Sequence, residues 1–79
     1  MADLIFARAD DWEGIYIDGK LIREGHSIDA QEAIQIALKH GVKTADTGYC
    51  DLNWLRDRGD LPQELSEVKW YAAPSRKGQ

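Results

Sequence analysis

The chain has 79 residues, of which 43% are hydrophobic and 30% are charged, so it has the composition of a folded domain rather than of a disordered chain. This length allows one hydrophobic core, with an expected radius of gyration of about 12 Å. The net charge of −4 argues against the clustered basic side chains that bind phosphates, so no nucleic-acid partner is expected.

The cysteine content and the N-terminus bear on where the protein works. Cys50 is the single cysteine, so an internal disulfide is excluded and a reducing cytoplasm fits best. The first residues lack the basic and long apolar segments of a signal peptide, and no apolar run approaches the roughly 18 residues of a membrane-spanning helix. We therefore expect a cytoplasmic protein with no membrane partner.

Two runs near the ends of the chain predict β-strands. Residues 4–8 (LIFAR) form a compact apolar run, and residues 10–11 (DD) then interrupt the pattern as a turn would. Residues 67–72 (EVKWYA) alternate in character, so that Val68 and Trp70 share one face of a last strand.

Residues 15–23 predict a β-hairpin, because two β-rich runs flank residues 18–19 (DG), a dipeptide that tolerates the positive φ of a tight turn. A two-residue turn pairs Ile17 with Lys20, whereas a three-residue turn with a bulge pairs Ile17 with Leu21. With the two-residue turn, three isoleucines share one face of the hairpin: Ile15, Ile17 and Ile22.

The main helix is predicted over residues 30–40. Either Ser27 or Asp29 can provide its N-cap, and with Asp29 at the cap Glu32 occupies the third helical position of a capping box. Gly41 then supplies the left-handed stop. Apolar residues at three- and four-residue spacing predict the core-facing stripe: Ala30, Ala33, Ile34, Ala37 and Leu38.

After the main helix, the sequence predicts a brief extended piece at residues 42–44 and a shorter second helix at residues 50–58. Leu52 and Leu55 face inward in this helix, whereas Trp54 lies roughly 200° from Leu52 and so off the core face. The predicted fold class is α+β, with a small antiparallel sheet made of the hairpin and the N- and C-terminal strands. This sheet packs against the main helix, and the second helix is short. Residues 1–73 form a single domain, and residues 74–79 (PSRKGQ) form a disordered tail because they lack apolar residues.

No residue pattern in the sequence specifies a catalytic, cofactor-binding or metal site. His26 lies between the predicted hairpin and helix, and His40 lies at the helix end, where the dipole favours a protonated imidazole. A carboxylate such as Asp51 beside Cys50 raises a thiol's pKa and so disfavours a nucleophilic role. We therefore expect no enzyme activity, no cofactor and no metal. The alternative is a small enzyme or ligand-binding protein that uses His26 and Cys50 together.

Because no catalytic, cofactor or metal site is expected, the aromatic residues are the remaining candidates for a functional surface. Three tryptophans in 79 residues is a high density, and tryptophan and tyrosine serve both as core anchors and as interface hot spots. Trp12, Tyr16 and Trp54 are the candidates for a protein-interaction surface. The sequence thus predicts a non-catalytic binding or regulatory module, whose partner is either another protein or a second copy in a homodimer.

Three segments resemble those of small uncharacterised proteins from bacteria and their phages: residues 12–21 (WEGIYIDGKL), 24–27 (EGHS) and 61–68 (LPQELSEV). The resemblance implies a free-standing domain associated with a phage or mobile element, and it carries over no catalytic residue. Residues 25–27 (GHS) and 32–33 (EA) are also similar to HicB-type antitoxins, in which a hairpin leads through a Gly-x-Ser/Thr turn into a helix containing Glu-Ala. The spacing is longer here. This likeness implies an antitoxin-type protein as a further alternative.

Overall fold

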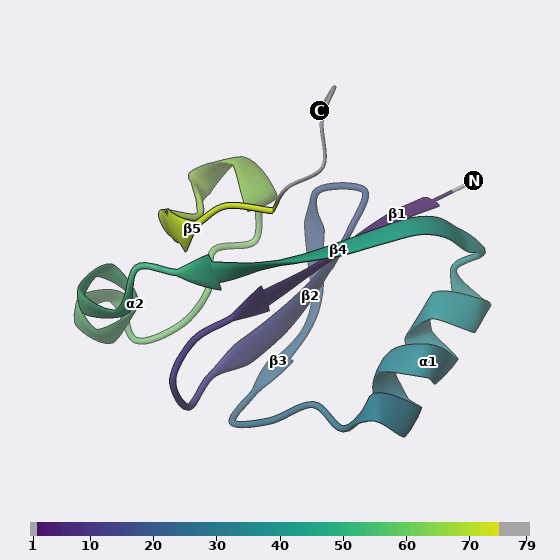
Figure 1. Cartoon of the computed structure of the whole chain (residues 1–79), viewed down its shortest axis with the longest axis horizontal. Coiled ribbons are helices and arrows are strands. Elements are labelled where there is room, and N and C mark those ends of the chain that lie inside the picture. Colours follow the sequence, from purple (N-terminus) through teal and green to yellow (C-terminus); the bar gives the residue numbers. More distant parts are fainter. Residues whose placement is uncertain (1, 75–79) are drawn as a thin grey trace.

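The computed structural model describes residues 2–74 and has a radius of gyration of 11.7 Å. Its framework is a mixed sheet in the strand order β3-β2-β1-β4-β5, and its two α-helices lie at opposite ends of the molecule (Figure 1). The elements in chain order are β1 (Ala2–Arg8), β2 (Glu13–Ile17), β3 (Lys20–Gly25), α1 (Ala30–Lys39), β4 (Val42–Cys50), α2 (Leu52–Arg58), the 3₁₀ turn η1 (Leu65–Glu67) and β5 (Trp70–Ala72).

The α+β class predicted from the sequence is confirmed, but the sheet is not wholly antiparallel. Strand β1 pairs antiparallel with β2 and parallel with β4. Parallel neighbours require a crossover connection, which the β2–β3 hairpin and α1 together supply. The direction of a strand does not change its apolar pattern, so the sequence alone gave no indication of this pairing.

Strand β4 is much longer than the predicted extended piece at residues 42–44. It spans nine residues and pairs with β1 from Ala2↔Val42 to Arg8↔Tyr49, with one bulge near its start. Three of residues 45–48 (ADTG), all but Thr47, have low β-propensity, so the extended conformation of this segment depends on the ladder that β1 provides. The pairing partner, rather than local preference, fixes the length of this strand.

The hairpin forms with the two-residue turn, since Ile17 pairs with Lys20 and the two turn residues have φ of 50° and 86°. A β-bulge follows in β3, and Ile22 is its extra residue. The bulge separates Ile22 from the two isoleucines with which it was predicted to share a face. Ile15 and Ile17 are buried, whereas Ile22 is 43% exposed.

The N-terminus of α1 matches its prediction closely. Asp29 is the N-cap, and its Oδ1 accepts a hydrogen bond of 3.0 Å from the backbone N–H of Glu32. The helix ends at Lys39, and Gly41 follows with φ of 64°. Ile28, which precedes the N-cap Asp29, is buried against the sheet, as expected of a residue in that position.

The face that α1 turns toward the sheet matches the predicted stripe only in part. Ala33, Ile36 and Ala37 pack against the core, while Ile34 and Leu38 are 57% and 72% exposed. At 100° per residue, the buried face is rotated by roughly 60° from the predicted one. An ion pair between Arg23 of β3 and Glu32 of α1 links the helix to the edge of the sheet.

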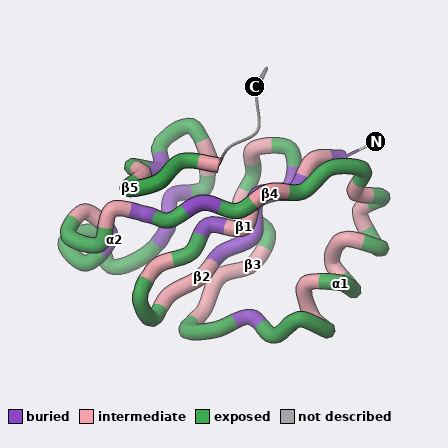
Figure 2. Tube along the Cα trace, viewed as in Figure 1, coloured by how far each residue is buried: buried purple, intermediate pink, exposed green. Residues whose placement is uncertain are grey.

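Both faces of the sheet are apolar, and buried residues concentrate in β1 and β2 (Figure 2). The α1-side core consists of Ala2, Leu4, Ile15, Ile17 and Ile28. The α2-side core consists of Ile5, Ala7, Tyr16, Cys50, Leu55, Leu61 and Val68. Successive residues of β1 and β2 therefore serve the two cores in turn, as the two-residue period of a strand requires.

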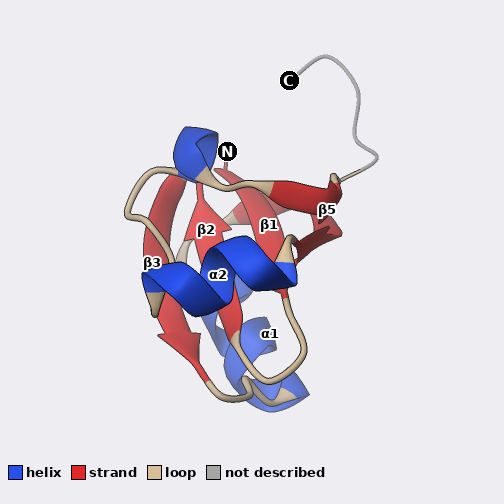
Figure 3. Ribbon diagram, turned by 90° about the vertical axis from the view of Figure 1, so that its left-hand side faces the viewer, coloured by secondary structure: helices blue, strands red, loops and turns tan. Residues whose placement is uncertain are grey.

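Helix α2 lies across the ends of the strands (Figure 3). Asp51 caps it by accepting a 3.0 Å hydrogen bond from the Trp54 N–H, and Gly59 ends it with φ of 92°. Leu55 is buried, as predicted, but Leu52 is 42% exposed and does not face inward. Leu52 is the first residue of the helix, where the chain has just left the sheet.

The last strand is shorter than the predicted residues 67–72, because Glu67 belongs to η1 and only residues 70–72 form β5. Val68 is buried, and Trp70 packs against the same core, so these two residues lie on the same side, as predicted. Of the predicted tail, Pro74 is half-buried, and residues 75–79 lie outside the described part of the chain.

We expect Gly48→Ala to destabilise the fold by about 1–3 kcal/mol, which is typical of overpacking. A Cβ at this position would lie 2.9 Å from the backbone nitrogen of Pro74 and 2.9 Å from the Trp70 ring. Urea unfolding followed by tryptophan fluorescence measures the effect. Gly25→Ala is the matched control, because its Cβ meets only the guanidinium end of Arg23. Equal losses for the two variants would show that no close approach constrains Gly48.

Candidate functional site

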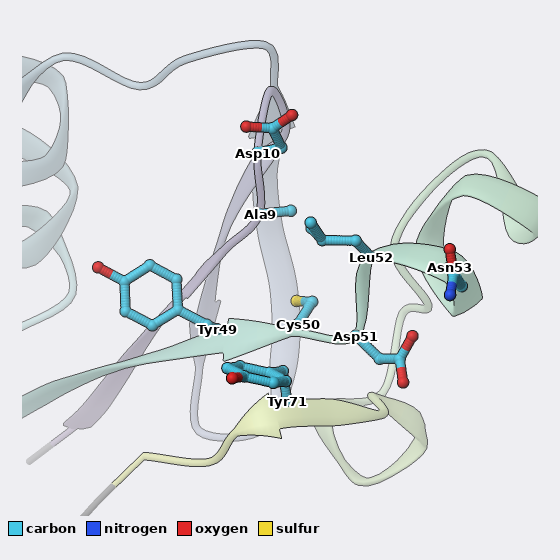
Figure 4. Close-up of a pocket in the computed structure, with 8 residues that line it drawn as sticks. All are labelled: Ala9, Asp10, Tyr49, Cys50, Asp51, Leu52, Asn53 and Tyr71. Carbon is cyan, nitrogen blue, oxygen red and sulfur yellow. The ribbon is translucent and has the colours of Figure 1, made fainter.

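A groove of about 700 Å³ opens where β1 and β4 end (Figure 4). Because these two strands are parallel, their carboxyl ends meet at the same end of the sheet, and the residues that follow each strand border one hollow. The lining residues are Ala9, Asp10, Tyr49, Cys50, Asp51, Leu52, Asn53 and Tyr71.

A smaller hollow of about 210 Å³ adjoins the first and shares Ala9, Asp10 and Leu52 with it. Its remaining lining residues are Asp11, Trp12, Leu55, Arg56 and Gly59. We refer to the two hollows together as the Leu52 groove. It runs between the loop after β1 and the start of α2, with Tyr71 bordering one hollow and Trp12 the other.

Exposed apolar side chains gather around the larger hollow. Tyr71 is 84% exposed, Tyr49 is 48% exposed and Leu52 is 42% exposed. Tyr71 is the extra residue of a β-bulge in β5, since Tyr49 pairs with Ala72 and Cys50 pairs with Trp70. Neighbouring residues of a strand point to opposite faces, so Tyr71 projects while its neighbour Trp70 packs inward. The sequence did not single out Tyr71 because alternation separates the two faces of the strand but does not show which face another segment covers.

Cys50 lies in this groove but has the environment of a structural thiol. It is 2% exposed, and burial raises the pKa of its thiol from 9.0 to about 11. Burial, rather than the Asp51 carboxylate expected from the sequence, is the cause. The thiol is therefore protonated at neutral pH and a poor nucleophile.

Neither histidine lines the Leu52 groove. The His26 ring lies edge-on to Trp12 with 5.1 Å between centroids, and its Nδ1 is 3.3 Å from the Asp11 carbonyl oxygen. His40 is the C-cap of α1. The structure thus does not bring Cys50 and a histidine together in this groove. Within residues 2–74, no group of three or more histidine, cysteine or carboxylate side chains is arranged to hold a metal ion.

Negative charge lies at the junction of the two hollows. The carboxylates of Asp10 and Asp11 make no hydrogen bond or ion pair with any described residue. Asp51 is engaged, because its Oδ1 caps α2 and its Oδ2 is 3.9 Å from Lys69 Nζ. On the neighbouring part of the sheet, the Arg8 guanidinium lies 5.7 Å from the Tyr49 ring centroid.

Of the three predicted interaction residues, the structure brings only Trp12 to the groove. Trp12 is half-buried, and its Nε1 donates a 2.9 Å hydrogen bond to Glu24 Oε1. Trp54 is half-buried against the α2-side core and does not line the groove.

Tyr16 has no exposed surface, so it cannot contact a partner in this fold. Its hydroxyl donates a 2.6 Å hydrogen bond to the Pro62 carbonyl oxygen, and burial raises its pKa above the ordinary tyrosine value. In the sequence both faces of the β-hairpin are partly apolar, so the pattern did not show which face is covered. Only the fold shows that residues 61–68 cover the face that bears Tyr16.

Comparisons with models of protein families, with curated proteins and with solved structures found no match to this chain. Neither of the described helices has the length and apolar character needed to cross a membrane.

We expect the free energy of unfolding to fall above about pH 9 through ionisation of Cys50 in the unfolded chain. A raised folded-state pKa means that the protonated thiol stabilises the fold fully below the unfolded pKa, and that this contribution is lost as pH rises toward 11. The loss is about 1–2 kcal/mol between pH 9 and pH 11. Urea titrations at each pH measure it.

The control for this prediction is Cys50→Ala. In this variant the free energy of unfolding should fall less between pH 9 and pH 10 than in the wild type. Tyr16 contributes in the same direction only as the pH rises through its ordinary pKa of 10.0 and beyond. An unchanged slope in Cys50→Ala below pH 10 would contradict the assignment to the thiol.

Proposed function

We propose that this protein is a non-catalytic binding module, a small cytoplasmic regulator that contacts a partner protein through the Leu52 groove. The observation that carries the proposal is the gathering of exposed Tyr49, Leu52 and Tyr71 around one hollow. Tyrosine in a concave apolar site is a typical interface hot spot. Such a patch on a domain of this size is a candidate for contact with another protein.

Both edges of the sheet favour contact through side chains over the addition of another strand. Strand β5 has only three residues and is bulged at Tyr71, and β3 is bulged at Ile22. The start of β3 is also covered, because Leu21 N–H donates to the Gln63 carbonyl oxygen and Leu65 N–H donates to that of Gly19. Short, bulged or covered edges resist pairing with another chain.

A photo-crosslinking amino acid at position 71 tests the proposal. We expect a discrete covalent adduct with one protein in native lysate, because the side chain here is exposed at the groove. The control places the same crosslinking amino acid at position 35, in place of Gln35 on the exposed side of α1. It should not capture that protein. Leu52→Asp in the position-71 crosslinker should abolish the adduct, since a carboxylate in the apolar hollow costs a desolvation penalty.

Identical capture from positions 71 and 35, or an adduct that survives Leu52→Asp, would contradict contact through the groove. Circular dichroism of the Leu52→Asp variant establishes that its fold is retained. Leu52 is at the surface, so the substitution is expected to leave the core intact.

Self-association is the second candidate, and the outer face of α1 favours it. Ile34 and Leu38 are exposed and stand four residues apart, so they form one apolar strip along the helix. The same strip on a second copy would bury it in a symmetric pair, as in most homodimers.

Light scattering across a dilution series separates this candidate from the first. If α1 mediates a dimer, the molar mass should fall from twice 8.9 kDa to 8.9 kDa on dilution, and Leu38→Glu should be monomeric throughout. Gln35→Glu carries the same added charge outside the strip and should behave as the wild type. A mass of 8.9 kDa at every concentration rejects the homodimer.

A further inference from the structure

The charges around the Leu52 groove indicate the chemistry of its occupant. Three carboxylates line the two hollows, from Asp10, Asp11 and Asp51, against the one guanidinium of Arg56. The Asp10 and Asp11 carboxylates have no partner among the described residues, so negative charge exceeds positive charge among the residues that line the groove.

Two further cations lie near the groove, and each already faces a carboxylate. Arg8 Nε is 3.6 Å from Glu13 Oε2, and Lys69 Nζ is 3.9 Å from Asp51 Oδ2. Neither cation forms an ion pair with Asp10 or Asp11 in the described part of the chain. The excess negative charge therefore belongs to the loop after β1.

We infer that the Leu52 groove binds a segment of a partner protein in which a large apolar side chain is flanked by a basic one. This inference rests on the proposed function and specifies the partner's chemistry. The apolar side chain enters the larger hollow between Tyr49, Leu52 and Tyr71. The basic side chain lies over Asp10 and Asp11 at the junction of the two hollows.

Arginine suits the basic position better than lysine. Its planar guanidinium can pair with a carboxylate through two hydrogen bonds and can stack on an aromatic ring at the same time. The groove offers both kinds of group, since Asp10, Asp11 and the Trp12 ring line the smaller hollow. The protein's own Arg8 lies over the Tyr49 and Phe6 rings, so cation–π contact already occurs on this part of the sheet.

The experiment is selection from a random peptide display library against the full chain, followed by calorimetry with the enriched peptides. We expect these peptides to carry arginine or lysine within a few residues of a large apolar side chain. NMR shifts should localise them to residues 9–12, 49–53 and 71. Affinity should fall as salt concentration rises, as expected of an exposed ion pair.

The variant Asp10→Asn/Asp11→Asn should weaken binding by about tenfold and flatten its salt dependence. The control is Asp57→Asn/Glu67→Gln, which removes the same charge at exposed positions outside the groove and should leave affinity within about twofold. A peptide of residues 74–79 (PSRKGQ) is basic but lacks an apolar anchor, and it should bind at least about tenfold more weakly than the enriched peptides.

Enrichment of acidic or uncharged peptides at the groove would overturn the inference and leave the binding function intact. Equal losses in the two double variants would overturn it as well, because the effect would then be one of net charge. If the peptide of residues 74–79 binds as tightly as the enriched peptides, binding does not require a large apolar side chain, and that part of the inference is wrong. The crosslink at position 71 decides the proposed function independently of these results.

Discussion

The parallel pairing of β1 with β4 is the constraint on which the rest of this structure depends. It gives β4 an extended conformation that residues 45–48 would not adopt by preference. It requires a crossover, which carries α1 over one face of the sheet. It also places the carboxyl ends of both strands together, so that Asp10 and Leu52, far apart in sequence, border one hollow.

A second set of contacts holds the C-terminal part of the chain against the opposite face. The Tyr16 hydroxyl donates to the Pro62 carbonyl oxygen, and one oxygen of Glu24 accepts from both Leu61 N–H and Trp12 Nε1. Glu24 thus ties the loop that carries Trp12 to the segment that covers the core. The hydrogen bonds that complete this core also fix one side of the candidate binding groove.

The exposed rings of the groove lie at the carboxyl end of β4 and on the short edge strand β5. A regular strand would alternate its side chains between the two cores, as β1 does. The bulge at Tyr71 breaks that alternation at an edge, where no described strand lies beyond β5. The candidate groove therefore borders a short, bulged edge strand, and edges of this kind resist pairing with another chain.

The sequence by itself determined the local elements: a tight hairpin turn at residues 18–19, an N-cap for α1 at Ser27 or Asp29, and the stop of that helix at Gly41. Each follows from interactions between residues a few positions apart. Tertiary structure decided the direction of β4, the burial of Tyr16 and the choice of Trp12 and Tyr71 as groove residues. These depend on which strands pair and on which segment covers a face, and both are set by contacts between residues distant in sequence.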